Sequence, residues 1–185
     1  MRVIAGSARS LKLTAPDGLK VRPTTDRIKE TLFNIISSDL YDCAFLDLFC
    51  GSGAIGIEAL SRGADRAVFV DDSSVSCECT RKNLEHTKLA ARAEIIRCDA
   101  ARALTRLAVR GDRFDIIVMD PPYNCNLEKS VLEEKHICDI LNSEGYIIVE
   151  ADSGTSFEYV ESLGFEVYRE KSYGSNKHVF LRILR

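Results

Sequence analysis

The sequence of 185 residues lacks any run of 18 or more apolar residues. A membrane-spanning helix needs about 20 such residues, and the N-terminus also lacks the charged-then-apolar pattern of a signal peptide. These two absences predict a protein with no membrane partner and a cytoplasmic location. The length is enough for a single domain with a substantial core, and we do not expect a second full domain.

A metal-ligand pattern is also missing. The histidines are scattered, and only two cysteines, Cys77 and Cys79, lie close together, at a spacing that is not the CxxC of a zinc site. A chain of this size does not need disulfides to be stable. We therefore expect packed, reduced cysteines and no metal. The histidines are His86, His136 and His178, and the seven cysteines are Cys43, Cys50, Cys77, Cys79, Cys98, Cys125 and Cys138.

Positive charge is not in excess over the whole chain, because the net charge is −3. A protein that binds nucleic acid through its entire surface is therefore not indicated. The first 29 residues differ from the rest, since they hold seven basic residues and two acidic ones. This segment fits a local phosphate-binding surface, and a solvated basic tail is the alternative. Its basic residues are Arg2, Arg9, Lys12, Lys20, Arg22, Arg27 and Lys29.

The N-terminal segment has the pattern of a small hairpin followed by a helix. Residues 2–5 and 11–15 read as two short strands joined by a glycine-containing turn. A helical pattern begins near Thr25 and places four aliphatic residues on one face. Those four residues are Ile28, Leu32, Ile35 and Ile36.

From Ala44 onward, apolar runs alternate with helical stretches, which predicts a mostly parallel sheet with helices on both faces. A final antiparallel hairpin is expected from 165–171 and 178–184, with turn residues between its halves. Expected strands are 44–48, 67–70, 93–97, 115–120 and 146–150. Expected helices are 54–62, 74–88, 100–110, 128–141 and 155–163.

Three glycines lie in the segment Asp47 to Gly56, where the first of these strands gives way to a helix. Glycines at such a place let the backbone turn sharply and approach a ligand closely. Their spacing matches GxGxxG, a nucleotide-binding fingerprint that is weak when it stands alone. The loop residues that we expect to contact a cofactor are Phe49, Gly51, Ser52 and Gly53.

An acidic residue at the end of the next strand strengthens this interpretation, because a ribose diol needs a carboxylate acceptor. Asp71 supplies the carboxylate, 20 residues after Gly51, and the adjacent Asp72 competes for the role. Strand alternation aims only one of the two at the ligand, and we favour Asp71. A tight turn followed by a solvated acidic pair is the alternative without a ligand.

Asp47 distinguishes between two cofactors that use such a loop. A carboxylate ahead of the glycines would sit badly beside a pyrophosphate, but it can accept from the ammonium of a methionine group. Asp99, followed by Ala100, lies at the end of the third strand, where a carboxylate can accept from an adenine amino group. An N-cap of the following helix is a compatible second role for Asp99. The pattern favours S-adenosylmethionine over a nicotinamide dinucleotide.

The fourth strand runs directly into Asp120-Pro121-Pro122-Tyr123. Two prolines stiffen the chain and remove two backbone donors, which leaves carbonyls that can point into a site. The Asp120 carboxylate and the Pro121 carbonyl can hold both hydrogens of a planar base amino group and orient its lone pair toward an electrophile. Tyr123 would stack on an unpaired or flipped base. A rigid turn is the alternative, and no metal is needed.

Read together, these motifs look like those of class I amino methyltransferases. The segments Arg22-Pro-Thr-Thr-Asp-Arg-Ile-Lys-Glu-Thr-Leu-Phe-Asn34, Glu58-Ala-Leu-Ser-Arg-Gly63 and Tyr173-Gly174 narrow the resemblance. Over nearly the whole chain, the sequence resembles the RsmD family of small-subunit ribosomal RNA guanine-N2 methyltransferases. Two departures are that many relatives carry Glu at the position of Asp71, and that residues 125–129 cannot be matched, so the residue that closes over the base is not identified.

The resemblance implies a Rossmann-like α/β fold with a seven-stranded sheet in the order 3-2-1-4-5-7-6. Residues 1–40 would be an RNA-contacting extension, and residues 41–185 a catalytic domain that binds S-adenosylmethionine and releases S-adenosylhomocysteine. The substrate implied is one guanine of small-subunit ribosomal RNA, in whole or partly assembled 30S particles, and we expect a monomer. Arg22, Thr24, Arg27 and Asn34 match the extension's motif. Arg22 and Arg27 are candidate phosphate contacts, or they pin the extension to the core.

Four other functions remain as alternatives. DNA adenine methyltransferases use a similar loop, but the chain lacks a large target-recognition domain. Protein glutamine methyltransferases typically have Asn where Asp120 stands. An NAD-dependent oxidoreductase has only the glycines in its favour, since no hydride-site His or Lys follows the fourth strand. A noncatalytic RNA-binding protein would not need intact cofactor and Pro-Pro-Tyr motifs.

Overall fold

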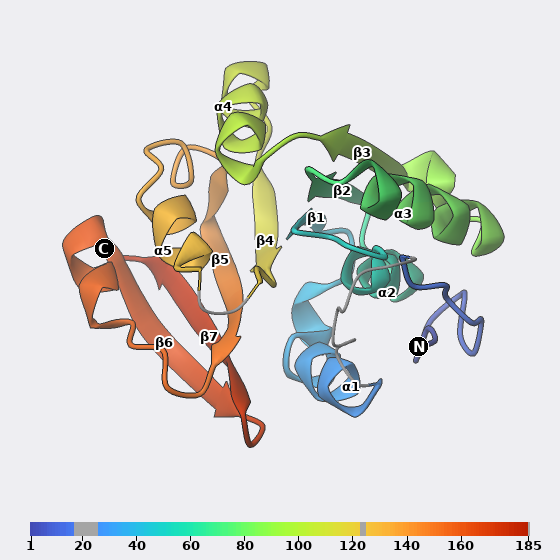
Figure 1. Cartoon of the computed structure of the whole chain (residues 1–185), viewed down its shortest axis with the longest axis horizontal. Helices are drawn as coiled ribbons and strands as arrows, with labels where there is room; N and C mark the ends of the chain where they lie inside the picture. Colours follow the sequence, from blue (N-terminus) through green and yellow to red (C-terminus); the bar gives the residue numbers. More distant parts are fainter. Residues whose placement is uncertain (17–25, 123–124, 185) are drawn as a thin grey trace.

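The computed structural model describes residues 1–16, 26–122 and 125–184. Its centre is a seven-stranded sheet in the order β3-β2-β1-β4-β5-β7-β6 (Figure 1). The first five strands pair in parallel, and β7 is antiparallel to both β5 and β6. The expected fold class and strand order are confirmed. The strands are β1 Ala44–Leu48, β2 Arg66–Asp71, β3 Ala93–Arg97, β4 Phe114–Met119, β5 Leu141–Asp152, β6 Phe165–Ser172 and β7 Asn176–Ile183.

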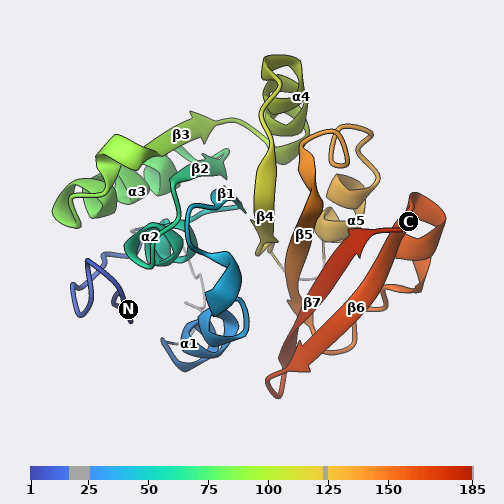
Figure 2. The same cartoon turned by 180° about the vertical axis from the view of Figure 1, so that it is seen from behind.

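Helices cover both faces of the sheet (Figures 1 and 2). Three of them contribute to the core cluster on one face: α1 (Asp26–Ile35), α2 (Ala54–Ser61) and α3 (Ser74–His86). The opposite face is covered by α4 (Ala100–Arg110), α5 (Leu127–Leu132) and the 3-10 helix η3 (Glu158–Leu163). Two further 3-10 turns are η1 (Ser37–Asp39) and η2 (Ala90–Arg92).

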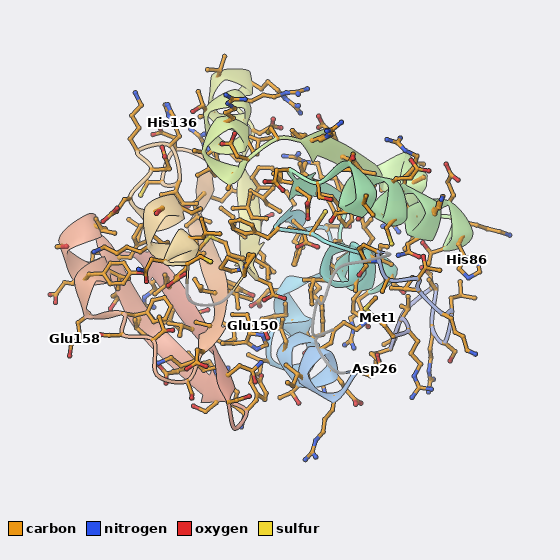
Figure 3. All side chains as sticks on the ribbon, in the orientation of Figure 1. Met1, Asp26, His86, His136, Glu150 and Glu158 are labelled. Atoms are coloured by element: carbon orange, nitrogen blue, oxygen red, sulfur yellow. The ribbon has the colours of Figure 1, made fainter. Side chains whose placement is uncertain are left out.

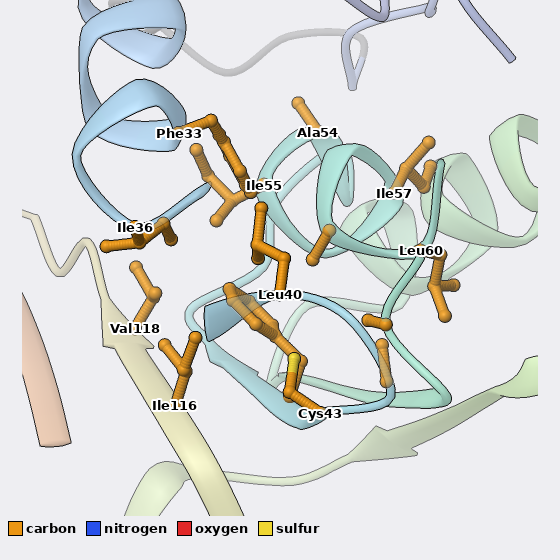
Figure 4. Packing of buried hydrophobic residues seen from close by; sticks show 14 of the residues in the cluster. Phe33, Ile36, Leu40, Cys43, Ala54, Ile55, Ile57, Leu60, Ile116 and Val118 are labelled. Carbon is orange, nitrogen blue, oxygen red and sulfur yellow. The ribbon is translucent and has the colours of Figure 1, made fainter. Parts of the chain in front are cut away.

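The two core clusters follow from the alternation of side chains along each strand. In β4, Ile116 and Val118 belong to the cluster under α1 and α2, whereas Ile117 and Met119 belong to the other one. Because a parallel strand in this position is buried on both faces, it reads in the sequence as a continuous apolar run. Figure 4 shows Phe33 of α1 beside Ile55 of α2, and Ile36, just after α1, beside Val118 of β4.

Expected helices and strands differ from the structure mainly in the second half of the chain. The helix expected over 128–141 is much shorter, because α5 ends at Leu132 and turns lead into β5. Ile137 and Ile140 are still buried, so their apolar spacing reflects packed turns rather than a helix. The α-helix expected over 155–163 is the six-residue η3, which brings Val160 into the core.

The N-terminal hairpin is present in a reduced form, as one antiparallel bridge between Arg2 and Lys12. The amide of Val3 donates to the carbonyl of Leu11 at 2.9 Å. Most of this segment's hydrogen bonds go instead to helices. Side chains of α2 and α3 accept from its backbone at Ile4, Ala5, Ala8 and Thr14.

Within the described ranges, no helix is long and apolar enough to cross a membrane. The same part of the chain contains no group of three or more His, Cys, Asp or Glu side chains that could hold a metal ion. Figure 3 shows His86 and His136 at opposite ends of the molecule. All seven cysteines are free, and burial raises the pKa of the Cys43 thiol to about 12.

Candidate active site

The glycine loop connects β1 to α2 at the carboxyl end of β1. Its backbone has positive φ at Phe49 (66°), Gly51 (55°) and Gly53 (74°). A Cβ on Gly53 would lie 2.8 Å from Thr80 Cγ2, and one on Gly56 would lie 2.3 Å from the Phe69 ring. Both glycines are therefore required by packing. Gly51 is different, because a Cβ there would meet nothing within 4 Å, so its open side can face a ligand.

Neighbouring side chains hold this loop in one conformation. Asp71 Oδ2 accepts from the amide of Gly51 at 2.9 Å, and the Thr80 hydroxyl donates to the carbonyl of Gly51 at 3.1 Å. Asn83 Nδ2 donates to the carbonyl of Ser52 at 2.9 Å. The loop is thus fixed before any ligand binds, which is the condition for positioning a cofactor without a further ordering cost.

Asp47 lies beneath the loop and is 2% exposed. Its Oδ2 accepts from the amide of Gly56 at 2.9 Å, so the carboxylate caps the first turn of α2. Burial raises the pKa of Asp47 to about 7, the Gly56 amide lowers it, and the charge of Asp71 raises it further. A carboxylate in this position favours a cation, because a positive group would offset the desolvation that raises the pKa.

The other acidic candidates lie at the ends of β2 and β3. Asp71 is half-buried and also accepts from the amide of Ser73 at 2.9 Å, whereas Asp72 is exposed. Asp99 is the N-cap of α4 and accepts from the amide of Arg102 at 3.0 Å. Ala100 is the first, half-buried residue of that helix. The capping role of Asp99 is therefore present, and adenine recognition by Asp99 stays a prediction.

The Asp120 loop leaves the sheet beside the glycine loop. β1 and β4 are parallel neighbours, and Leu48 is the register partner of Met119. Both loops therefore leave the same edge of adjacent strands, at the point where the strand order reverses, which is where open α/β sheets bind ligands. Asp120 is half-buried, Pro121 is buried and Pro122 is exposed. Tyr123 lies outside the described residues.

Two of the four candidate RNA contacts lie in the described part of the chain. Arg27 and Asn34 are exposed on α1, whereas Arg22 and Thr24 lie outside the described residues. Lys29, one of the basic residues counted in the extension, is only 1% exposed. It contributes to the interior rather than to a phosphate-binding surface. Lys29 instead helps to hold the N-terminal segment against the core, since its Nζ donates to the carbonyl of Arg2 at 2.6 Å.

Lys29 is part of a buried ion-pair cluster centred on Glu58. Its Nζ lies 3.2 Å from Glu58 Oε2, and Arg62 Nε lies 2.8 Å from Glu58 Oε1. The amides of Ile4 and Ala5 donate to the two carboxylate oxygens at 2.8 and 3.0 Å. Burial lowers the pKa of Lys29, and the charge of Glu58 opposes that shift. This cluster joins the first residues of the chain, α1 and α2.

A second buried polar cluster was missed as a unit by the sequence reasoning. It joins Glu150 on β5 to His178 and Asn176 on β7, and to Tyr173 just before β7. Glu150 could have been found from the sequence, because it is a carboxylate near the carboxyl end of a buried strand. The same pattern identified Asp47 and Asp71. In the sequence, His178 is only one of three scattered histidines.

The residues of the first three strand ends fit the methionine and nucleoside parts of S-adenosylmethionine. The open side of Gly51 leaves room for the ligand backbone, and the buried Asp47 carboxylate favours an ammonium. Asp71 can accept from a ribose hydroxyl in addition to the Gly51 amide, since each carboxylate oxygen has two lone pairs. A pyrophosphate would instead bring two negative charges toward Asp47.

Comparison with known proteins agrees with this arrangement. The family model described as "Conserved hypothetical protein 95" matches residues 1–182. The chain is 34% identical to ribosomal RNA small subunit methyltransferase D of Escherichia coli (strain K12) over 174 residues, which are 94% of this chain and 85% of the relative. It is 39% identical to YlbH of Bacillus subtilis (strain 168) over 175 residues, 94% of each protein.

A solved structure shows the same likeness in three dimensions. The E. coli protein yhhF superposes with a TM-score of 0.84 at 34% identity, covering 100% of this chain and 98% of that one. The sheet order and the full-length family match agree with the resemblance seen in the sequence. The chain therefore belongs to the conserved hypothetical protein 95 family, which is the RsmD family of class I methyltransferases.

Proposed function

We propose that this protein methylates ribosomal RNA, with S-adenosylmethionine as its cofactor, and that the acceptor is the N2 amino group of one guanine in the small subunit. The observation that carries the proposal is the register of β1 and β4, which places the glycine loop and Asp120 at the same sheet edge. The relatives named as ribosomal RNA methyltransferases support ribosomal RNA as the substrate. The choice of guanine N2 rests on the sequence resemblance.

The chemistry requires activation of a poor nucleophile. A base amino nitrogen shares its lone pair with the ring, and S-adenosylmethionine supplies an electrophilic methyl group on a sulfonium. Asp120 and the carbonyl of Pro121 accept the two amino hydrogens and so turn the lone pair toward the methyl carbon. As the bond between N2 and the methyl carbon forms, the bond between that carbon and sulfur breaks, which would leave S-adenosylhomocysteine. The nitrogen becomes cationic, the Asp120 carboxylate stabilises that charge, and one amino proton passes to water.

The cofactor is held by the residues on the other side of the same edge. Asp47 binds the ammonium, Asp71 the ribose and Asp99 the adenine amino group. Phe49, Gly51, Ser52 and Gly53 form the loop between them, with Asp72 and Ala100 beside it. The rigid loop described above keeps the cofactor from shifting away from the acceptor nitrogen.

The RNA is held by the extension, residues 1–40, which includes α1. Arg27 and Asn34 are exposed on α1, and the exposed side chains of Arg2, Arg9 and Lys12 add positive charge to the same segment. Because the Glu58 cluster fixes this segment to α2, phosphates bound there would be held at a defined distance from the catalytic edge. We propose that the protein acts as a cytoplasmic monomer on 30S particles, with residues 1–40 as the RNA-contacting part.

Mass spectrometry of ribosomal RNA nucleosides tests this function. A strain without the gene should lose N2-methylguanosine at one position of the small-subunit RNA, and the gene in trans should restore it. The Asp120→Ala protein should not restore it. Unchanged N2-methylguanosine together with loss of another methylated nucleoside would reassign the acceptor, and no loss of any methylated nucleoside would refute the RNA substrate.

A further inference from the structure

The buried cluster around Glu150 has a composition that packing does not explain. Glu150 is 4% exposed and His178 is 1% exposed. His178 Nε2 lies 3.2 Å from Glu150 Oε2, and Asn176 Nδ2 donates to Glu150 Oε1 at 2.7 Å. His178 Nδ1 lies 3.1 Å from the hydroxyl of Tyr173. Removing a carboxylate from water is costly, so a carboxylate kept there needs a reason beyond filling space.

Strand register places this cluster next to the Asp120 loop. Met119 of β4 is the partner of Val149 of β5, and Glu150 is the partner of His178 of β7. One residue past the register pair Met119 and Val149 come Asp120, directly after β4, and Glu150, which is still in β5. Figure 3 shows Glu150 within the molecule, between the C-terminal strands and α1.

Alternation of side chains along the strands predicts that Asp120, Glu150 and His178 share one face of the sheet. Val118, Ile148 and Phe180 all lie in the core cluster under α1 and α2. Two residues further toward the carboxyl edge, alternation places Asp120, Glu150 and His178 on that same face. Adjacent strands are about 4.8 Å apart, so two neighbouring carboxylates fall within the width of one purine edge.

Hydrogen-bond polarity fixes Glu150 as an acceptor. A carboxylate only accepts, so the His178 Nε2 that faces Glu150 carries the hydrogen of their contact, and the Tyr173 hydroxyl contacts Nδ1 on the other side of the ring. Burial and the charge of Glu150 raise the pKa of Tyr173 to about 12, which keeps its hydroxyl protonated. Asn176 and His178 therefore orient the Glu150 carboxylate as an acceptor toward a donor on the ligand.

Bases differ in what lies beside their reacting amino group. Guanine has a donor, N1–H, next to its N2 amino group. Adenine has the acceptor N1 next to N6, and cytosine has the acceptor N3 next to N4. Two adjacent carboxylates thus complement guanine, whereas they would repel the ring nitrogen of adenine or cytosine. A site that hydrogen-bonds a substrate N–H strongly rejects an analogue that lacks it.

We propose that Glu150 is a specificity-determining residue, which accepts the N1–H of the target guanine beside Asp120, and that His178 and Asn176 are positioning residues for it. This inference rests on the proposed function and deepens it, because it names the group that selects guanine. These three residues lie on β5 and β7, and neither strand contributes a residue to the glycine loop between β1 and α2.

The test compares guanine with 2-aminopurine at the methylated position of the small-subunit RNA. 2-Aminopurine keeps the 2-amino group, but its N1 is an acceptor. Wild-type protein should show a kcat/KM at least about tenfold higher for guanine, as expected for loss of a hydrogen bond to a charged group. Glu150→Gln keeps the size of the side chain and presents an amide that can donate to N1. This variant should bring the two values within about threefold.

Glu158→Gln is the matched control, because Glu158 is exposed on η3 at the outer edge of the molecule (Figure 3) and should leave the ratio unchanged. Wild-type protein that accepts 2-aminopurine as well as guanine would overturn the inference without any variant. A Glu150→Gln protein that slows both substrates equally would also overturn it, because Glu150 would then only support the Asp120 loop. Failure of wild-type protein to methylate guanine would instead refute the proposed function.

Discussion

Two buried glutamates, Glu58 and Glu150, occupy very different surroundings in this protein. Glu58 is fully buried and meets two cations, Lys29 and Arg62, together with two backbone amides. Glu150 accepts from the side-chain amide of Asn176 and contacts the imidazole of His178. Glu58 joins three segments that are far apart in sequence. Glu150 lies at the sheet edge where the catalytic loop begins.

The difference teaches how to recognise the role of a buried carboxylate. Glu58 is surrounded by fixed charges and fixed backbone, so its interactions are complete within the protein, and its role is to hold the extension in place. Glu150 is oriented by the side chains of Asn176 and His178 and lies beside Asp120 in the register of the sheet. The following experiments should separate a structural cluster from a functional one, in order of decreasing effect.

The largest effect is expected for Asp120→Ala, on the functional side of the comparison. Loss of the acceptor that stabilises charge in the transition state should lower kcat by about 10²–10³-fold. Affinity for S-adenosylmethionine should stay within a few fold, because the cofactor contacts belong to other strands. Asp65→Ala, at an exposed aspartate before β2, is the control. Full activity of Asp120→Ala in a single-turnover assay would contradict its catalytic role.

Lys29→Met should have the largest effect on the structural side. The change leaves the carboxylate of Glu58 buried with one cation fewer, and breaking a buried ion pair costs about 3 kcal/mol or more. Urea unfolding should show that loss, whereas Lys12→Met, at an exposed lysine, should change the unfolding free energy by less than about 0.5 kcal/mol. A loss below about 1 kcal/mol for Lys29→Met would mean that the ion pair does not stabilise the fold.

The affinity for S-adenosylmethionine, measured as a function of pH, tests a third buried acid, Asp47. Its pKa is about 7 in the free protein. Binding an ammonium requires the ionised form, so only the ionised fraction is competent. Affinity for S-adenosylmethionine should therefore be roughly tenfold weaker at pH 6 than at pH 8. Calorimetry on Asp47→Asn should give a weaker affinity that no longer changes over this range. A wild-type affinity independent of pH would contradict the role of Asp47.

The raised pKa of Asp47 also predicts the direction in which the unfolding free energy changes with pH. The pKa of Asp47 in the folded protein lies above the ordinary value of 3.8, so between about pH 4 and pH 7 the folded state holds a proton that the unfolded state has released. The unfolding free energy should therefore fall between about pH 4 and pH 7, and this loss should be complete above pH 7. Asp47→Asn cannot ionise. Its Tm should exceed that of the wild type at pH 8, and the difference should shrink toward pH 4.

Arg27→Ala should have the smallest effect, because Arg27 is an exposed counterpart of the buried Lys29 on the same helix. Loss of one phosphate contact should reduce the slope of log K against log salt by about 0.7–0.9 and weaken particle binding a few fold. Lys88→Ala, at an exposed lysine after α3, is the control for charge. An unchanged slope for Arg27→Ala would place the RNA surface elsewhere.

The cofactor side of the site could be predicted from the sequence because its residues are close in the chain. A single strand, turn and helix contain Asp47, Gly51, Gly53 and Gly56, and the packing of the last two glycines explains why no side chain is tolerated there. The acceptor side is different. Asp120 was found from the Pro-Pro dipeptide that follows it, whereas Glu150 and His178 became neighbours only through the pairing of β5 with β7.

The same reason explains why Lys29 was misread. By sequence it belongs to a basic segment, and only the docking of α1 against α2 shows that its charge faces Glu58. Likewise, the apolar spacing of Ile137 and Ile140 was read as a helix, although turns bring both side chains into the core. A local apolar pattern predicts which side chains are buried more reliably than it predicts whether they lie in a helix, a strand or a turn.

The sequence by itself determined the sheet class, the glycine loop with its acids and the Asp120 loop, because each depends on backbone preferences and side chains within a few residues of one another. Only the tertiary structure decided which charges are paired and which face the catalytic edge. Ion pairs and hydrogen bonds act over about 3–4 Å in space, and strand pairing sets which distant residues come within that range. Glu58 and Glu150 look alike in the sequence, and their neighbours make one an anchor and the other a candidate reader of guanine.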